Sequence, residues 1–259
     1  MTTLRSFIAF ISAAVLSFAA APASSGIVYD LSVNTTVAVP TLDGTMWVST
    51  EFTKTTGTGV INPFLSIQSN TTEAGYNIDS GVLDTKRNGQ YSRTQRVSDL
   101  QTVTVAGISY YAFLLDINEP NNAESLISID TFAIYTSNQL LITFNQLVTT
   151  GTLQFSMDSA DPQTTLLYDD LNTGSGQGDV AFFIPVTALT GVASTDYFYL
   201  YQEFGNANLS HNSQSGFEET RHGGDLTFVP IPETNVVLPI LAVLGVMAAG
   251  PLVRRRFQP

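Results

Sequence analysis

Short apolar stretches alternate with polar, turn-forming clusters along most of this chain. Between residues 127 and 135, apolar and polar side chains alternate with a period of two, and the phase of the alternation changes midway. The runs 140–144 and 180–184 lack alternation, which favours interior strands buried on both faces. Clusters of Gly, Asn, Asp and Ser separate these stretches. The pattern predicts an all-β protein.

Twelve segments are predicted to be strands. They cover residues 26–31, 45–52, 64–69, 101–105, 109–116, 126–135, 139–144, 152–155, 164–168, 179–185, 196–204 and 226–228. Asp43-Gly44 and Asn88-Gly89 are predicted turns, and Asn88-Gly89 is the strongest hairpin candidate because it tolerates positive φ values. Pro185 is placed to start a short helix over 186–189. Without a fixed-period repeat, the predicted fold is an antiparallel β-sandwich of jelly-roll-like type.

The N-terminal residues have the three-part layout of a signal peptide. Arg5 precedes an apolar run over 7–16, and the small residues Ala21 and Ala23 predict cleavage after Ala23. The alternative is a buried core helix, for which the Ala-x-Ala ending is unusual. We therefore expect residues 1–23 to be a signal peptide and residues 24–228 to form one β-sandwich ectodomain.

Charge and cysteine content narrow the function classes. Residues 24–235 hold all 22 acidic residues but six of the ten basic ones, so this segment has a net charge of −16. Such a surface repels nucleic acid and anionic lipid and favours cations or neutral partners. The chain contains no cysteine. A disulfide framework, a thiolate metal site and a thiol nucleophile are therefore excluded.

The C-terminal residues 229–259 form a separate element. A short Pro-Glu segment over 230–234 is followed by the uncharged apolar stretch 236–253 and by three arginines over 254–256. Eighteen apolar residues are just long enough to span a bilayer core as a helix. The arginines would hold that end on the cytoplasmic side, so the ectodomain would face outward.

This order of elements resembles the PEP-CTERM sorting signal of exported bacterial proteins. The resemblance implies that Pro232 and Glu233 mark where an exosortase processes the chain, and that Arg254, Arg255 and Arg256 form its basic end. Thr234 departs from the family, in which a second Pro is common at this position. A C-terminal anchor that is never cleaved is the alternative. Segments 57–68, 111–118 and 199–205 are also similar to stretches of exported PEP-CTERM proteins of unassigned activity.

No cofactor is expected, and calcium is the one candidate that the composition suits. The segment 116–121 begins like a calcium loop, but Asn121 stands where Gly is expected and Ile127 where the bidentate Glu belongs. Ordinary turn residues are the favoured interpretation, and a calcium site with another geometry is the alternative. The candidate ligands of such a site are Asp116, Asn118, Glu119 and Asp130.

Aromatic residues form a run over 197–201. On a strand, Tyr197, Tyr199 and Tyr201 share one face, while Phe198 and Leu200 share the other. An exposed tyrosine stripe could stack on sugar rings. The alternative is that Phe198 and Leu200 face the core while the tyrosines pack under a loop or a neighbouring strand.

Catalytic motifs are sparse, and no catalytic residue is proposed. The two histidines are His211 and His222, and no Gly-x-Ser-x-Gly elbow occurs. Two pairs of adjacent carboxylates occur, Asp169-Asp170 and Glu218-Glu219. In each pair the two side chains would point to opposite faces of a strand, so neither pair by itself can flank one glycosidic bond.

The sequence predicts a non-enzymatic protein exported to the cell surface or extracellular matrix of a Gram-negative bacterium. Its expected partners are the secretion machinery and an exosortase, with the inner membrane as a transient one and an exopolysaccharide as a further candidate. A carbohydrate- or calcium-binding adhesin is the first alternative, and a secreted polysaccharide hydrolase is the weaker one.

Overall fold

A computed structural model describes residues 27–54, 62–86, 89–119, 126–158, 165–169, 178–205, 211–214 and 216–228. The predicted signal peptide over 1–23 and the predicted tail over 229–259 lie outside these residues. None of the helices in the described part of the chain has the length and apolar character needed to cross a membrane.

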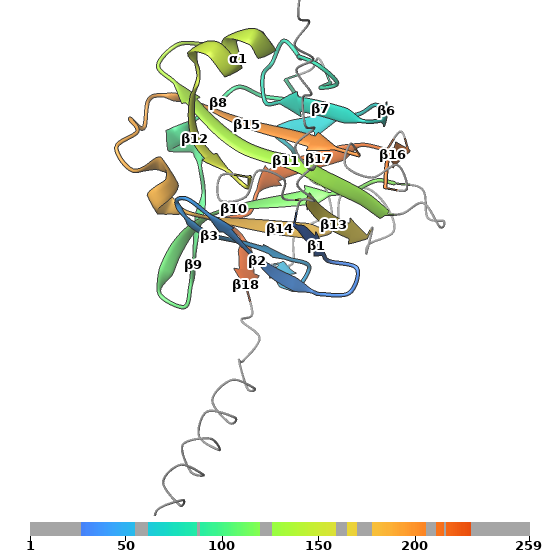
Figure 1. Ribbon diagram of the computed structural model, residues 1–259. Helices are drawn as coiled ribbons and strands as arrows, with labels where there is room; N and C mark the ends of the chain where they lie inside the picture. Colours follow the sequence, from blue (N-terminus) through green and yellow to red (C-terminus); the bar gives the residue numbers. More distant parts are fainter. Residues whose placement is uncertain are drawn as a thin grey trace, which may run out of the picture.

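Strands dominate the described residues, which confirms the all-β prediction. Two seven-stranded sheets hold most of them (Figure 1). In the first sheet the order is β1 (Val28–Asp30), β13 (Thr165–Asp169), β11 (Leu126–Ser137), β15 (Tyr197–Phe204) and β7 (Glu73–Tyr76), with β12 (Thr152–Ser156) on β11 and β8 (Gln95–Arg96) on β15. In the second sheet it is β2 (Thr36–Thr41), β3 (Gly44–Ser49), β14 (Val180–Pro185), β10 (Ile108–Asp116), β17 (Glu218–His222) and β5 (Leu65–Ile67), with β9 (Thr102–Val105) on β10.

Two small sheets and three short helices complete the described structure. The small sheets pair β16 (Ser213–Gln214) with β6 (Asn70–Thr71), and β18 (Leu226–Phe228) with β4 (Phe52–Lys54). The helices are η1 (Val97–Asp99), α1 (Phe144–Thr150) and η2 (Val186–Leu189). All described ladders are antiparallel except that between β1 and β13. The antiparallel prediction is therefore confirmed, with this one parallel pair as the exception.

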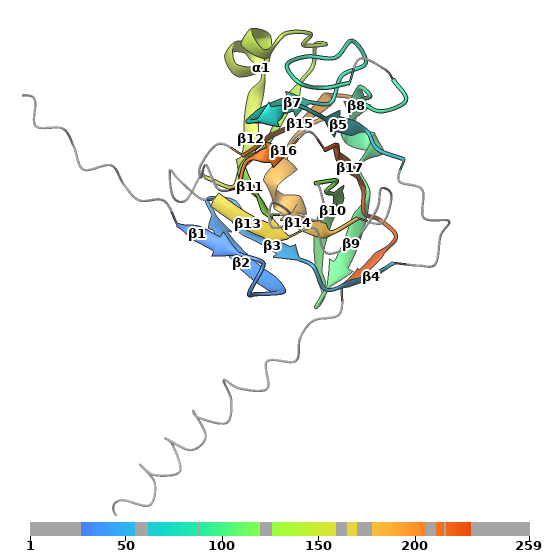
Figure 2. The same ribbon diagram turned by 90° about the vertical axis from the view of Figure 1, so that its right-hand side faces the viewer.

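Both large sheets contribute side chains to one hydrophobic core. Phe132 of β11 and Phe182 of β14 stack across it, with ring centroids 4.7 Å apart. Phe113 of β10 and Phe198 of β15 are nearly parallel at 5.9 Å. Figure 2 shows η2 near the end of the strands, where its contacts reach β12 and β10 and its buried residues join the same core. Each fully buried Phe contributes roughly 1.5–3 kcal/mol through burial alone.

The phase change within β11 has a structural cause. The pairing of β11 with β15 shifts register between Ile129 and Thr131, so Asp130 occupies a β-bulge. A bulge inserts one unpaired residue and reverses which alternate positions face inward. Ile127 and Ile129 before it, and Phe132 and Ile134 after it, therefore all reach the core.

The two runs without alternation behave differently. All residues of β14 are buried, as predicted for an interior strand. The strand predicted over 139–144 is wrong, because α1 begins at Phe144 and residues 139–143 before it form no strand. Only Leu141 of that run is buried, whereas Leu140 and Ile142 are 46 % and 51 % exposed. The Thr143 side chain ends the extended segment by capping α1.

The turn predictions have different outcomes. Asp43-Gly44 lies at the β2–β3 hairpin, where Gly44 has a φ of 125°. The Asn88-Gly89 turn stays a prediction, because Asn88 lies outside the described residues; the nearest described strands on either side, β7 and β8, each pair with β15 and not with each other. The tight hairpin between β9 and β10 turns on Ala106 and Gly107, both with positive φ. The predicted helix after Pro185 is confirmed as η2.

Candidate functional site

The inward face of β17 is polar although it borders the core. Glu218, Thr220 and His222 alternate along the strand and therefore project from the same face. Thr220 donates a hydrogen bond from its hydroxyl to Oε1 of Gln202 on β15, 2.9 Å away, across the two large sheets. A polar row thus runs along the core side of the second sheet.

Glu73 on the first sheet meets this row at the Glu218 end. It is the first residue of β7 and is completely buried. Its Oε2 accepts a hydrogen bond from the Ser69 backbone N–H at 2.7 Å and one from the Ser213 hydroxyl at 3.1 Å. Its Oε1 has no hydrogen-bond partner. The two bonds hold the turn before β7 and the strand β16 around one carboxyl group.

Glu119 approaches from the segment that follows β10. It is 3 % exposed, and its Oε2 accepts a hydrogen bond from the backbone N–H of Gln214 at 2.7 Å. Its Oε1 is buried without a partner. Glu119 and Glu73 therefore bind neighbouring residues of β16, which brings their carboxyl groups to the same end of the fold.

Glu218 lies between these two side chains. It is 1 % exposed, and neither of its oxygens accepts a hydrogen bond from an N–H or hydroxyl donor. Its carboxyl group instead interacts with those of Glu73 and Glu119, and this interaction adds to burial in raising the pKa of Glu218. Two carboxyl groups can make this contact as a hydrogen bond only if one of them carries a proton. We call Glu73, Glu119 and Glu218 the carboxyl cluster.

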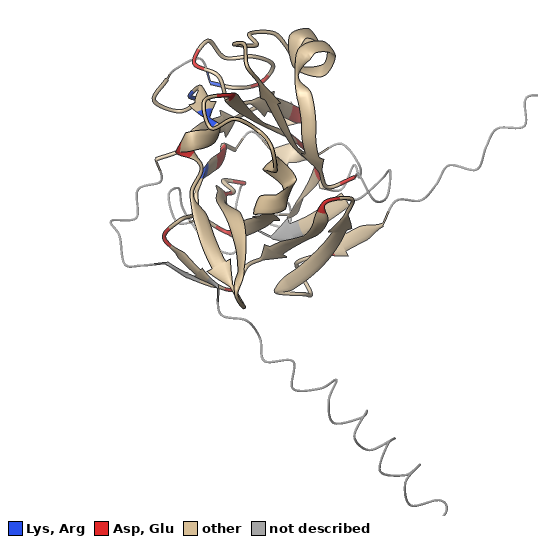
Figure 3. Ribbon diagram, turned by 90° about the vertical axis from the view of Figure 1, so that its left-hand side faces the viewer, with Lys and Arg blue, Asp and Glu red and all other residues tan. Residues whose placement is uncertain are grey.

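Burial dominates the electrostatics of the carboxyl cluster. Desolvation raises the pKa of Glu119 to about 7, and the negative charge of Glu73 adds to this effect. Burial and the neighbouring carboxyl groups raise the pKa of Glu218 well above its ordinary value, and burial also raises the pKa of Glu73. A charged carboxylate is unfavourable in such surroundings because water no longer solvates it. Figure 3 shows that acidic positions occur in both large sheets and in their connections.

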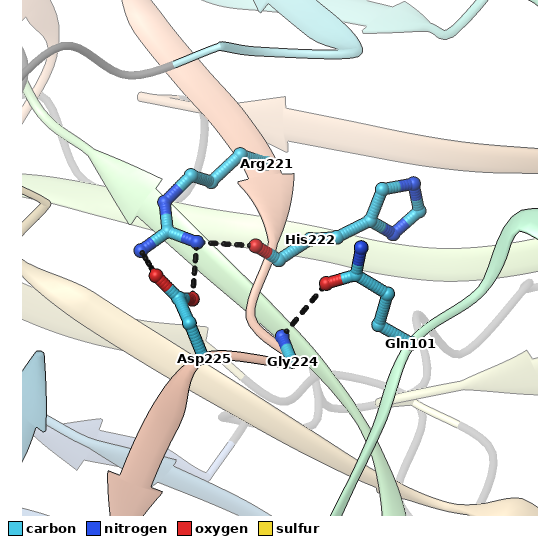
Figure 4. Close-up of polar contacts among 5 residues, drawn as sticks. All are labelled: Gln101, Arg221, His222, Gly224 and Asp225. Carbon is cyan, nitrogen blue, oxygen red and sulfur yellow. Dashed lines mark hydrogen bonds and ion pairs between the residues drawn. The ribbon is translucent and has the colours of Figure 1, made fainter. Parts of the chain in front are cut away.

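His222 ends the polar row on the opposite side. Its ring stacks on Phe64 with centroids 4.6 Å apart, and Nε2 lies 3.2 Å from Oε1 of Gln95. Desolvation lowers the pKa of His222 to about 4, so the imidazole is neutral near pH 7. Arg221 leaves β17 on the other side and forms an ion pair with Asp225 (Figure 4). Gly224, the residue before Asp225, donates a hydrogen bond from its backbone N–H to the Gln101 side chain.

The four residues predicted to bind calcium do not gather at one point. Asp116 accepts hydrogen bonds from the Gly178 N–H at 3.0 Å and from the Asn118 amide at 3.1 Å. Glu119 joins the carboxyl cluster, and Asp130 on the other large sheet accepts a bond from the Ser128 hydroxyl at 3.0 Å. Across the described ranges, no group of three or more His, Asp or Glu side chains is arranged to hold a metal ion. Asp116 and Asn118 order the end of β10.

The tyrosine stripe on β15 packs internally. Phe198 and Leu200 face the main core, which is the alternative that the sequence left open. On the other face Tyr199 is completely buried, and its hydroxyl accepts a hydrogen bond from the Leu141 N–H at 2.8 Å and donates one to the Gln139 carbonyl at 3.2 Å. Tyr197 and Tyr201 are half-buried in the same cluster. Tyr199 is therefore not available to stack on a sugar ring.

The remaining predicted site residues lie outside the described part of the chain. They are Ala21, Ala23, Pro232, Glu233, Arg254, Arg255 and Arg256. Asp170 also lies outside it. Glu218 and Glu219 do point to opposite faces, since Glu219 lies near Lys86 and Asp116 while Glu218 faces Glu73.

Sequence reasoning missed the carboxyl cluster. Its members are separated by 46 and 99 residues along the chain, so no local motif joins them. The available signal was the alternation of Glu218, Thr220 and His222, which marks one face of β17 as polar. Comparisons of this chain with models of protein families, with curated proteins and with solved structures gave no match.

Proposed function

We propose that this chain is an exported, non-enzymatic protein of the cell surface or extracellular matrix of a Gram-negative bacterium, sorted by a PEP-CTERM-like tail. The observation that carries the proposal is the order of the C-terminal elements: Pro232-Glu233, the apolar stretch 236–253 and the arginines 254–256. An apolar span that ends in arginines inserts with those charges on the cytoplasmic side. The ectodomain would then face outward and leave the membrane when an exosortase removes the tail.

The N-terminal residues support the same proposal. The apolar run over 7–16 follows Arg5 and ends in the small residues Ala21 and Ala23, which suits a secretory signal. The described strands all lie between Val28 and Phe228, between the two proposed targeting segments. A cysteine-free β domain of this length stabilised by its core is compatible with an exported location.

We also propose that the two large sheets form a jelly-roll-like β-sandwich. The support is the shared core, in which rings from β11 and β15 meet rings from β14 and β10. Such a domain would present its loops and outer faces to the matrix, while an acidic surface would favour neutral polysaccharide or cations over nucleic acid.

Intact-mass analysis of the protein from exported fractions of its native host tests the sorting proposal. We expect loss of residues 1–23 and loss of the tail near Glu233. A variant with Arg254, Arg255 and Arg256 replaced by Gln should retain the tail or fail to be exported, whereas Arg221→Gln in the ectodomain should be processed normally. If the wild-type chain were recovered in a membrane fraction with residues 236–256 intact, the tail would be a permanent anchor and not a sorting signal.

A further inference from the structure

The carboxyl cluster joins three parts of the fold that separate strand ladders hold elsewhere. Glu73 belongs to the first large sheet, and Glu218 belongs to the second. Glu119 reaches the cluster from the end of β10, and both Glu73 and Glu119 are bonded to residues of the small β6–β16 sheet. The interactions among these three side chains therefore also hold this end of the domain together.

The hydrogen bonds of the cluster are incomplete if all three groups are ionised. Within the described residues, Oε1 of Glu73, Oε1 of Glu119 and both oxygens of Glu218 are buried and have no N–H or hydroxyl donor. A buried oxygen without a donor costs free energy, and a buried unpaired charge costs more. A proton on one carboxyl group supplies the missing donor and removes a charge at the same time.

The charged surroundings favour such a proton. The charged groups that act most strongly on the cluster are its own members, together with Asp84 from the segment after β7. β16 contributes the neutral Ser213, and β5 places Ile67 beside Glu218. The other face of β17 carries Arg221, which is paired with Asp225, and meets Lys86, which acts on Glu219. Like charges in contact disfavour full ionisation.

We propose that a proton on Glu218 holds the carboxyl cluster together, an arrangement that we call the proton-held latch. The protonated carboxyl group of Glu218 donates a hydrogen bond to Glu73 or Glu119. Folding therefore takes up protons, and alkali loosens this end of the domain. Removing the proton leaves adjacent carboxylates that repel one another across the two large sheets. The β6–β16 sheet, which is bonded to two of the three groups, would separate first. The latch would operate wherever the domain resides, so it does not rest on the sorting proposal.

Unfolding of the full chain in detergent tests the latch between about pH 7.5 and about pH 8.5, a range above the ordinary His pKa of 6.5 in which His222 is almost entirely neutral in both states. Fluorescence of Trp47, the single tryptophan, reports urea unfolding. For each excess proton bound by the folded state, the equilibrium constant for unfolding should rise about tenfold per pH unit. Glu218→Gln replaces the proton with a permanent N–H donor, so its dependence on pH should fall by half or more. Glu51→Gln, at an exposed position, is the matched control and should keep the wild-type slope.

Three results would overturn the latch. The first is a wild-type stability that does not change over this pH range, and the second is an unchanged slope in Glu218→Gln. The third is stabilisation of the wild type by millimolar calcium that Glu218→Gln abolishes, since the groups would then hold a cation instead. If Glu218→Gln does not fold, proton uptake during wild-type refolding at about pH 8, followed with an indicator dye, decides the question: about one proton supports the latch and none overturns it.

Discussion

The imidazole of His222 lies against the ring of Phe64, with 4.6 Å between centroids and 25° between planes. Phe64 belongs to the main core, so this contact places a titratable group at the inner border of the second large sheet. The stacking explains why the imidazole is neutral in the folded protein: a charged ring would lose its water there.

His222 should make the folded protein sensitive to acid. Its folded pKa of about 4 lies below the ordinary value of 6.5, so the unfolded chain binds a proton first as the pH falls. The contribution is fully present above pH 6.5 and is lost on acidification toward pH 4, by up to about 3 kcal/mol. Urea unfolding at both ends of this range measures it. His222→Gln and His222→Phe should both reduce the loss, and a wild-type loss in both variants would contradict the assignment.

Tyr199 should stabilise the fold through its hydroxyl. In Tyr199→Phe, the buried N–H of Leu141 loses its acceptor, at a cost of about 1–3 kcal/mol. Tyr197→Phe is the control on the same strand face, because its half-buried ring keeps the contact with Arg96, and its effect should stay within about 0.5 kcal/mol. Thermal unfolding of both variants gives the comparison. Equal effects would mean that the hydroxyl bonds of Tyr199 contribute nothing specific.

Thr143 should hold the start of α1. Its hydroxyl accepts the Gln146 N–H at 3.2 Å, while the Gln146 side chain accepts the Thr143 N–H at 3.2 Å, which is a capping box. Thr143→Ala should cost about 0.5–2 kcal/mol and speed hydrogen exchange at Gln146. Thr150→Ala, at the exposed last residue of the helix, should change neither quantity appreciably. Unaltered exchange in Thr143→Ala would show that packing alone holds the helix.

Phe132 and Phe182 should be energetically coupled if the large sheets pack as a sandwich. Replacing either ring with Ala should cost about 3–5 kcal/mol through lost burial and the cavity left behind. The double variant should cost less than the sum, because their stacked contact contributes about 0.5–1.5 kcal/mol beyond area burial. A double-mutant cycle measures this coupling. Strict additivity of the two losses would argue against direct packing of the two rings.

The local pattern of apolar and polar residues was sufficient to predict which side chains share a strand face. The alternation over 197–201 correctly separated Phe198 and Leu200 from the tyrosines, and the structure bears out the alternative in which these two residues face the core. The phase change in 127–135 corresponds to the bulge at Asp130. The same logic failed over 139–144, because apolar content cannot distinguish a buried strand from a loop with one buried residue. The Thr143-x-x-Gln146 signal for a helix was present there, and the capping box shows its use.

The amino-acid order by itself determined the β class, the facing of the alternating strands, the acidic charge and the exclusion of cysteine chemistry, since these depend on composition and on neighbours two residues apart. Only the tertiary structure decided that Glu73, Glu119 and Glu218 meet, that Asp116, Glu119 and Asp130 form no metal site, and that Tyr199 is covered by the segment before α1. These outcomes depend on contacts between residues far apart in the chain. Strand pairing and sheet packing create such contacts, and no local period records them.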